Sequence, residues 1–156
     1  MFLKKLIGRT WRAMPVWGRR LIVRASQPSF TVSAAVILIN DDKQILLLDH
    51  VLRPASGWGV PGGFLNPNEQ PRETAEREVF EETGLKIEQL EMFYVQTNQR
   101  HIEFWFIGTA NGAACARSRE ILEAKWFALD DIPPEMNKKE QRLIKQAVQI
   151  GEKQRV

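Results

Sequence analysis

The sequence predicts an α/β or α+β sandwich, and three observations support this class. Apolar, β-branched stretches that are typical of strands alternate with two well-separated segments of helical periodicity. The length of 156 residues suits one domain, which buries roughly two-thirds of its unfolded surface. The hydrophobic fraction of 44% and the charged fraction of 26% are ordinary for a soluble globular protein.

A basic arm, residues 1–27, precedes the predicted domain, residues 28–156. Its apolar residues recur at helical spacing until Pro15 interrupts the pattern: Leu3, Ile7, Trp11 and Met14. Residues 1–24 hold seven Lys or Arg and no acid, whereas the rest of the chain has a net charge of −4. An acidic body is not the footprint of a nucleic-acid surface, so we expect no nucleic-acid partner.

Three interpretations of the arm stay open. The first is an amphipathic helix that packs on the domain or on a second subunit of a homodimer, and the sequence favours it. The second is contact with an anionic membrane surface, with Trp11 and Trp17 in the interface. The third is a cleaved organellar transit peptide, because the arm is arginine-rich and acid-free. No apolar run approaches the roughly 18 residues that a membrane span needs.

The domain begins with predicted strands and a loop. Five stretches have the composition of strands: Phe30–Asn40, Gln44–Val51, Glu88–Gln99, His101–Asn111 and Ala124–Ile132. An Asp-Asp-Lys turn joins the first two as a hairpin. Residues 53–68 are rich in glycine and proline and predict a loop.

Two helices complete the prediction. The first spans Gln70–Thr83, with Pro71 in its first turn and Gly84 just past its end, as helix termini prefer. The second spans Asn137–Ile150 and closes the chain. Its inward side chains are Leu143, Ile144, Ala147 and Val148.

The end of the first helix crowds three carboxylates together. Glu78, Glu81 and Glu82 fall within an arc of about 100° on the helix, beside an apolar strip that includes Ala75 and Val79. Like charges one turn apart repel, so a cation is expected to compensate. Oxygen donors without histidine or thiolate suit a hard cation such as Mg²⁺ or Mn²⁺. Taken alone, however, a glutamate-rich helix face is as easily a solvated surface.

The surrounding residues resemble the Nudix box, whose pattern is G-x₅-E-x₇-R-E-U-x-E-E-x-G-U with U apolar. The chain matches every fixed position: Gly63, Glu69, Arg77, Glu78, Val79, Glu81, Glu82, Gly84 and Leu85. Chance would give such a match on the order of once in 10⁹ windows at average residue usage, which excludes the solvated-surface alternative. The segment Trp58–Gly63 and the strand that ends in "DDIP" extend the likeness over about residues 30–150.

The resemblance implies a fold, a reaction and a cofactor. The fold is a Nudix-type α/β/α sandwich with a mixed β-sheet, in the α/β class. The reaction is hydrolysis of a phosphoanhydride bond in a nucleoside diphosphate linked to another moiety, with Mg²⁺ or Mn²⁺ as the cofactor.

The single cysteine, which excludes an intramolecular disulfide, fits a cytoplasmic location.

The resemblance also assigns roles to residues of the box. Glu81 and Glu82 are implied metal ligands, and Glu78 is either a ligand or the base that activates water. Arg77 is expected to hold a glutamate by paired hydrogen bonds. The Gly62 carbonyl is a further candidate ligand. Two other box positions have supporting roles, since Gly63 allows close approach of the substrate and Glu69 is structural at the loop–helix junction.

A further acid is expected from outside the box, just before the last core strand. Glu120 has the spacing that best resembles MutT-type members, ahead of Glu123 and Glu103. Arginines and lysines lie nearby in the sequence, so the alternative is that these acids only offset local positive charge.

Substrate contacts are less sharply indicated. Arg53 lies in a stretch that resembles the GDP-mannose hydrolases and is a candidate phosphate clamp, although a solvated loop arginine is the alternative. Trp58 is a candidate for stacking on a base or for the core. Asn137 resembles an asparagine that contacts the purine edge in MutT-type proteins, but it is equally a helix N-cap.

The sequence therefore predicts an enzyme that acts on a small-molecule nucleotide. The favoured reaction cleaves a nucleotide sugar or a related compound to a nucleoside monophosphate and a phosphorylated product. The alternative is a MutT-type pyrophosphatase of (deoxy)nucleoside triphosphates. A non-catalytic Nudix module that senses nucleotides is less favoured, because this chain keeps every glutamate of the box.

Overall fold

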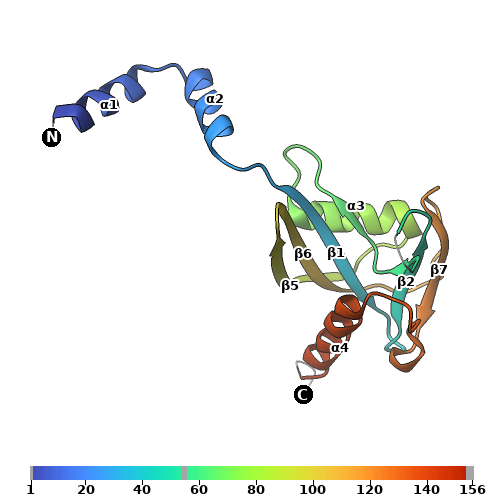
Figure 1. The fold of residues 1–156 in the computed structure, drawn as a ribbon. Helices are drawn as coiled ribbons and strands as arrows, with labels where there is room; N and C mark the ends of the chain where they lie inside the picture. The colour runs from blue at the N-terminus through green and yellow to red at the C-terminus, as the bar shows by residue number, and fades with distance from the viewer. Residues whose placement is uncertain (1, 54–55, 154–156) are drawn as a thin grey trace. The chain divides into compact units, whose positions relative to one another are not determined.

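The computed structural model describes residues 2–53 and 56–153. It divides into two compact units, residues 1–31 and residues 32–156, with the division close to the predicted end of the arm. Figure 1 shows that the first unit is helical and that the second contains the sheet together with α3 and α4.

The first unit consists of α1 (Phe2–Ala13) and α2 (Val16–Ser26). Helical spacing and the break at Pro15 were both predicted, and both are confirmed. The sequence did not predict that a second helix would begin directly after the proline. Pro15 stands at the N-cap of α2 with a φ of −63°, so its ring interrupts α1 while leaving the next helix free to start. Within the described residues, neither these helices nor any other could cross a membrane.

The second unit contains a seven-stranded mixed sheet over the described residues. The strands are β1 (Thr31–Ile39), β2 (Ile45–His50), β3 (Trp58–Gly59), β4 (Gly62–Phe64), β5 (Gln89–Asn98), β6 (His101–Thr109) and β7 (Ile121–Phe127). The order is β3-β2-β1-β6-β5, with β4 also paired to β1 and β7 also paired to β2. The predicted β1–β2 hairpin is confirmed as an antiparallel pair, and β5 and β6 form a second one.

The prediction that residues 53–68 are only a loop is wrong at two places. β3 pairs antiparallel with β2, and β4 pairs antiparallel with β1 so that Gly62 lies opposite Ala35 and Gly63 opposite Ala34. Glycine was taken as a signal of a loop, but here it permits close strand contact. A Cβ at Gly62 would overlap the carbonyl oxygen of Ala34.

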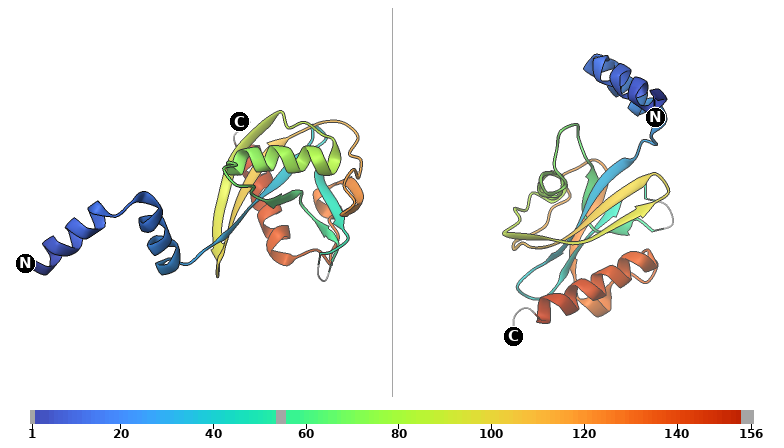
Figure 2. Two further views of the ribbon diagram at one scale, coloured as in Figure 1. Left: turned by 90° about the horizontal axis from the view of Figure 1, so that it is seen from above. Right: turned by 90° about the vertical axis from the view of Figure 1, so that its left-hand side faces the viewer.

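Two helices cover opposite faces of this sheet (Figure 2). α3 (Pro71–Thr83) buries Ala75 and Val79 against one core, and α4 (Lys138–Lys153) buries Ile144 and Ala147 against the other. A short 3₁₀ helix, Leu129–Asp131, precedes α4. The predicted α/β/α sandwich with a mixed sheet is confirmed. The sandwich places the carboxylate-bearing end of α3 over the short β4 strand.

Candidate active site

The glutamates are held by a helix with strong local termini. Pro71 occupies the first turn of α3, and Gln70 and Glu73 form a capping box. The peptide N–H of Gln70 donates to the Glu73 carboxylate at 2.9 Å. At the other end Gly84 adopts the left-handed conformation with a φ of 77°, which glycine reaches without steric cost. Both ends of the helix are therefore set by residues next to it in the sequence.

Arg77 is the hub of the carboxylate cluster. Its Nε and Nη2 donate to the two oxygens of Glu69 at 2.7 and 3.0 Å. Its Nη1 donates to Glu78 at 2.7 Å and to Glu81 at 3.2 Å, and Nη2 also donates to the Phe64 carbonyl at 3.2 Å. One guanidinium thus connects β4, the loop before α3 and two turns of the helix. The same hydrogen bonds lower the pKa of Glu69 to about 2, the pair with Arg77 contributing most.

Glu82 lies in a different environment, because it is only 7% exposed. On the helix it borders the apolar strip of Ala75 and Val79, which face the sheet. The peptide N–H of Gly62 donates to its Oε2 at 3.1 Å. Burial raises the pKa of Glu82 to about 8, although the Gly62 hydrogen bond opposes the shift. By contrast, the Glu81 side chain is 57% exposed.

The raised pKa of Glu82 indicates that Glu120 lies near the box glutamates. The negative charges of Glu78 and Glu120 both raise the pKa of Glu82, in addition to the effect of burial. Glu120 lies in the turn before β7, and its carbonyl accepts a hydrogen bond from the Val51 peptide N–H at 2.9 Å. An acid from outside the box therefore lies within electrostatic reach of the box glutamates.

The other two candidates for the extra acid lie elsewhere. Glu103 accepts hydrogen bonds from the indole of Trp105, at 2.8 Å, and from the Gln96 amide. Trp105 belongs to the core on the α4 side of the sheet, so Glu103 is on the face opposite to α3. Glu123 lies opposite Asp49 in the β2–β7 ladder. Of the three candidates, only Glu120 is among the leading causes of the raised pKa of Glu82.

Gly63 brings β4 close to the helix. Any Cβ at Gly63 would overlap the carboxylate of Glu78. The side chain of Glu78 is 17% exposed, so its exposure is intermediate between that of the buried Glu82 and that of the exposed Glu81. The three box glutamates therefore occupy three different environments on one helix.

The donors at this site have the chemistry that a hard divalent cation requires. Carboxylates of Glu78, Glu82 and Glu120 offer oxygen, and no sulfur or imidazole group is among them, while Gly62 contacts Glu82 through its peptide N–H. The crowding of negative charge around Glu82 also fits a cation. Among the described residues, no three acidic, histidine or cysteine side chains are already arranged to hold one ion. Arg77 accounts for part of this, because it holds Glu78 and Glu81 in ion pairs.

The predicted substrate residues have other partners in this structure. Arg53 donates to the Trp58 carbonyl at 3.3 Å and pairs with Glu140 of α4 at 3.1 Å. The Trp58 ring packs edge-on against Phe127 with the ring centroids 5.0 Å apart. Asn137 accepts a hydrogen bond from the Lys139 peptide N–H at 2.9 Å, so it caps α4.

Sequence reasoning missed Glu140 and His50. Burial raises the pKa of Glu140, and the nearby Arg53 partly opposes this. Burial and the charge of Arg53 lower the pKa of His50 to about 4, and its Nε2 is buried without a partner among the described residues. No local signal could have paired Arg53 with an acid 87 residues later.

The NUDIX domain family matches residues 29–147 of this chain. The chain belongs to the NUDIX family. Glu69, Glu78, Glu81 and Glu82 belong to its Nudix box, whereas Glu120 lies outside it, and the resemblance predicted from the sequence is confirmed.

Individual Nudix proteins extend this finding. The chain is 33% identical over 114 residues to the NAD-capped RNA hydrolase NudC of Mannheimia succiniciproducens. The alignment covers 67% of this chain but only 42% of that protein. It is 30% identical to a MutT-like protein of Streptomyces ambofaciens, over 71% of this chain and 72% of that one. The fold matches the NUDIX domain of Shewanella oneidensis NrtR, solved with ADP ribose, at a TM-score of 0.68 and 22% identity, over 80% and 89% of the two chains.

Proposed function

We propose that this Nudix protein is a divalent-metal-dependent pyrophosphohydrolase of small nucleotides. Its substrate is a nucleoside diphosphate linked to another moiety, such as a nucleotide sugar, and its products are a nucleoside monophosphate and a phosphorylated product. The observation that carries the proposal is the buried Glu82, whose pKa is raised first by burial and further by the charges of Glu78 and Glu120. Like charges that are crowded in this way are costly unless they serve to bind a cation.

The residues of the cluster would have three roles, as metal ligands, as a base and as a positioning group. Glu82, Glu81, Glu120 and the Gly62 carbonyl would hold Mg²⁺ or Mn²⁺, and Glu78 would act as a ligand or as the base that takes a proton from water. A divalent cation supplies charge neutralisation at the phosphates and lowers the pKa of a bound water. Arg77 acts as a positioning residue, because its hydrogen bonds orient Glu78 and Glu81 against Glu69.

The substrate side is proposed from the loop that precedes α3. Arg53 pairs with Glu140 and would exchange this partner for the phosphates of the substrate. Gly63 would allow the phosphates to approach the helix closely, since it carries no side chain. Trp58 and Asn137 remain candidates for contacts to the base, although the first packs on Phe127 and the second caps α4.

The names of two relatives support a substrate that is a nucleoside diphosphate linked to another group. NAD and ADP ribose, which their names contain, both have this chemistry. A second candidate, hydrolysis of (deoxy)nucleoside triphosphates, is supported by the MutT-like relative, of which the alignment covers 72%. A polynucleotide substrate is less favoured, because residues 25–156 have a net charge of −4 and offer little attraction to a phosphate backbone.

The test is a substrate panel with products identified by mass. Nucleotide sugars, ADP ribose, NAD, nucleoside triphosphates and an NAD-capped RNA are incubated with the full chain and Mg²⁺ or Mn²⁺. Parallel reactions contain EDTA, or the Glu82→Gln variant with metal. Metal-dependent release of a nucleoside monophosphate from a nucleotide sugar, ADP ribose or NAD supports the first candidate, and release of pyrophosphate from a triphosphate supports the second. Tight binding without turnover of any compound would instead identify a sensing module.

A further inference from the structure

The two helices of the first unit expose apolar side chains to an unusual extent. Trp17 is 72% exposed, Leu21 is 63% exposed, and Leu3, Ile7 and Ile22 are also exposed. Isolated exposed apolar residues are common on protein surfaces, but here they recur on consecutive helical turns. Surfaces of this kind mark a site where something else binds.

Each helix has an apolar side, and most of the cations lie at its borders or opposite to it. In α1, Leu3, Leu6, Ile7 and Trp11 fall within about 140° of arc, and Lys5, Arg9 and Arg12 lie opposite. In α2, Trp17, Leu21 and Ile22 fall within about 140° of arc, and Arg24 and Arg19 lie at the two borders of this arc. Arg20 lies on the other side of the helix, together with Val16 and Val23. α1 therefore has the pattern of a segment that lies in an interface between water and an apolar phase, and α2 adds an apolar side that is bordered by arginines.

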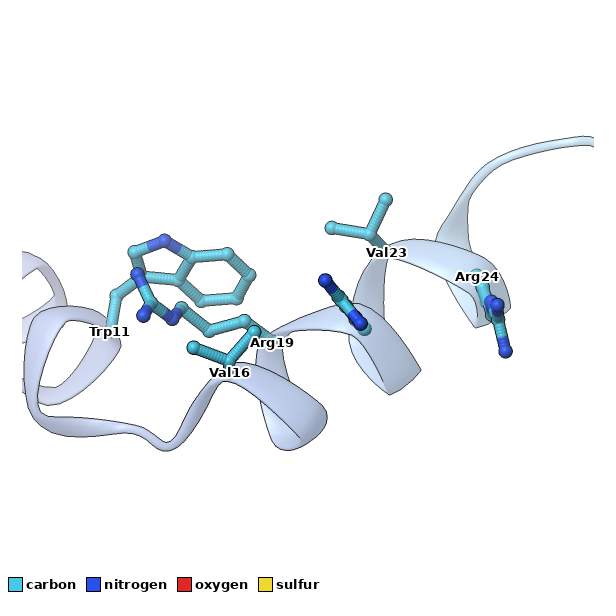
Figure 3. A pocket seen from close by; sticks show the side chains of 6 residues that line it. Trp11, Val16, Arg19, Val23 and Arg24 are labelled. Carbon is cyan, nitrogen blue, oxygen red and sulfur yellow. The ribbon is translucent and has the colours of Figure 1, made fainter. Parts of the chain in front are cut away.

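A hollow between the two helices gathers part of the positive charge (Figure 3). It is lined by Trp11, Val16, Arg19, Arg20, Val23 and Arg24 and has a volume of about 590 Å³. Figure 3 shows the Arg19 side chain beside the Trp11 indole. The Arg19 Nε is buried and has no hydrogen-bond partner among the described residues. A buried donor on a guanidinium needs an acceptor, and a phosphate oxygen is the strongest one.

The length of the helices excludes a spanning arrangement. At about 1.5 Å per residue, a helix of 12 residues is roughly 18 Å long, whereas the hydrocarbon core of a bilayer is about 30 Å thick. The arrangement left for α1 and α2 is to lie flat in the interface.

We propose that α1 and α2 bind the surface of an anionic lipid bilayer. Their apolar sides enter the interface, and the hollow around Arg19 receives the phosphate of a lipid head group. Seven cations without an acid match an anionic surface, and the same charge disfavours pairing of this segment with its counterpart in a second copy. A nucleic acid would match the charge but would leave Trp17 and Leu21 in water.

Vesicle flotation of the full chain tests the proposal. We expect the protein to float with vesicles of phosphatidylcholine that contain about one-third phosphatidylserine, and to stay at the bottom with phosphatidylcholine alone. Binding should weaken as NaCl rises from low to physiological concentration and beyond, because the attraction falls off with the Debye length. No flotation with the anionic vesicles, or equal flotation with the neutral ones, would overturn the proposal.

Two pairs of matched variants locate the contact. The triple variant Arg19→Gln, Arg20→Gln, Arg24→Gln should partition about 100-fold more weakly, since each cation near an anionic bilayer contributes about fivefold. Its control removes three exposed cations of the second unit through Lys86→Gln, Arg142→Gln and Lys145→Gln, and should bind like the native chain. Leu21→Ser should weaken partitioning several-fold, whereas Leu122→Ser, at a residue of similar exposure (66%), should have no effect.

A second measurement separates lipid binding from self-association. Sedimentation of the native chain without lipid should give the same mass as that of Leu21→Ser. A dimer that Leu21→Ser dissociates would assign the apolar side to a second copy of this chain and overturn the proposal. Equal effects of the arm variants and their controls on flotation would overturn it as well.

Discussion

The guanidinium of Arg77 and the carboxylate of Glu69 form two parallel hydrogen bonds, at 2.7 and 3.0 Å, across the junction between the β4 loop and α3. Glu69 also accepts from the Asn66 peptide N–H at 2.8 Å, so the pair fixes the loop as well as the helix. The third nitrogen of the same guanidinium reaches Glu78 and Glu81. This relationship makes Arg77 the residue through which the loop and the box glutamates keep a common geometry.

Arg77→Lys should lower both the melting temperature and kcat. Lysine keeps the charge but lacks the planar fork, so it cannot hold Glu69 and Glu78 at once. We expect kcat to fall at least tenfold while KM changes less, because the role proposed for Arg77 is to orient Glu78 and Glu81 and not to bind substrate. Steady-state kinetics and thermal melting measure the two effects. Arg142→Lys on the exposed side of α4 is the control, and equal behaviour of the two variants would contradict the positioning role.

Loss of a box carboxylate should reduce turnover strongly. Glu82→Gln and Glu81→Gln are each expected to lower kcat by about 10²-fold or more, close to 3 kcal/mol of transition-state stabilisation. Glu76→Gln on the same helix serves as the control, because its carboxylate only pairs with Arg72 at the exposed surface. Rates are compared at saturating Mg²⁺ for the best compound of the panel. Near-native turnover of both box variants would show that the site is assigned wrongly.

The Glu82→Gln variant should be at least as stable as the native chain when EDTA is present. The amide keeps the shape and can still accept the Gly62 hydrogen bond, while the crowding with Glu78 and Glu120 disappears. Mg²⁺ should raise the melting temperature of the native chain with the logarithmic dependence of a ligand that binds the folded state, but should not raise that of the variant. A large drop in melting temperature in EDTA would indicate a structural role for Glu82.

The three candidates for the extra acid should separate by activity. We expect Glu120→Gln to lower kcat at least tenfold, because this carboxylate lies in the electrostatic environment of Glu82. Glu123→Gln and Glu103→Gln should stay within a few-fold of the native rate, since their neighbours are Asp49 and Trp105 respectively. The three variants are compared with the same substrate and metal. A larger loss from Glu103→Gln than from Glu120→Gln would reverse the assignment.

His50 should make the folded state sensitive to acid. Its pKa is lowered from 6.5 to about 4, so between these values the unfolded chain binds a proton that the folded protein does not. The stability linked to this group is fully present above pH 6.5 and is lost as the pH falls toward 4. His50→Gln should therefore show a shallower decline of unfolding free energy over this range. Denaturant titrations at several pH values measure it, and parallel curves for the two proteins would refute the prediction.

Local sequence was sufficient to predict the helix that carries the site. Pro71, Gly84 and the capping residues act within a few positions of the helix ends, so they specify α3 without distant contacts. The box pattern then identified the family, because its fixed positions lie on this helix and the loop before it. The family resemblance in turn implied the α/β/α sandwich, so the fold was also predicted from these local residues.

Tertiary structure decided how the glutamates differ from one another. The helical wheel placed Glu78, Glu81 and Glu82 on one side, but the sheet covers only part of that side. Glu82 is buried beneath Gly62, whereas Glu81 stays exposed, and only packing against β4 separates them. The sequence did not predict β4, because its glycines are typical of a loop. Their pairing with β1 depends on residues almost 30 positions away.

Tertiary structure also decided which distant residues reach the site. Strand alternation puts Glu103 and Trp105 on the same side of β6, but the sequence does not say which side α3 covers. The ion pair of Arg53 with Glu140 likewise joins a loop to a helix 87 residues later. Capping and periodicity act over one or two turns and are readable in the sequence. Burial and charge contacts arise only when separate elements pack, so the fold alone determines them.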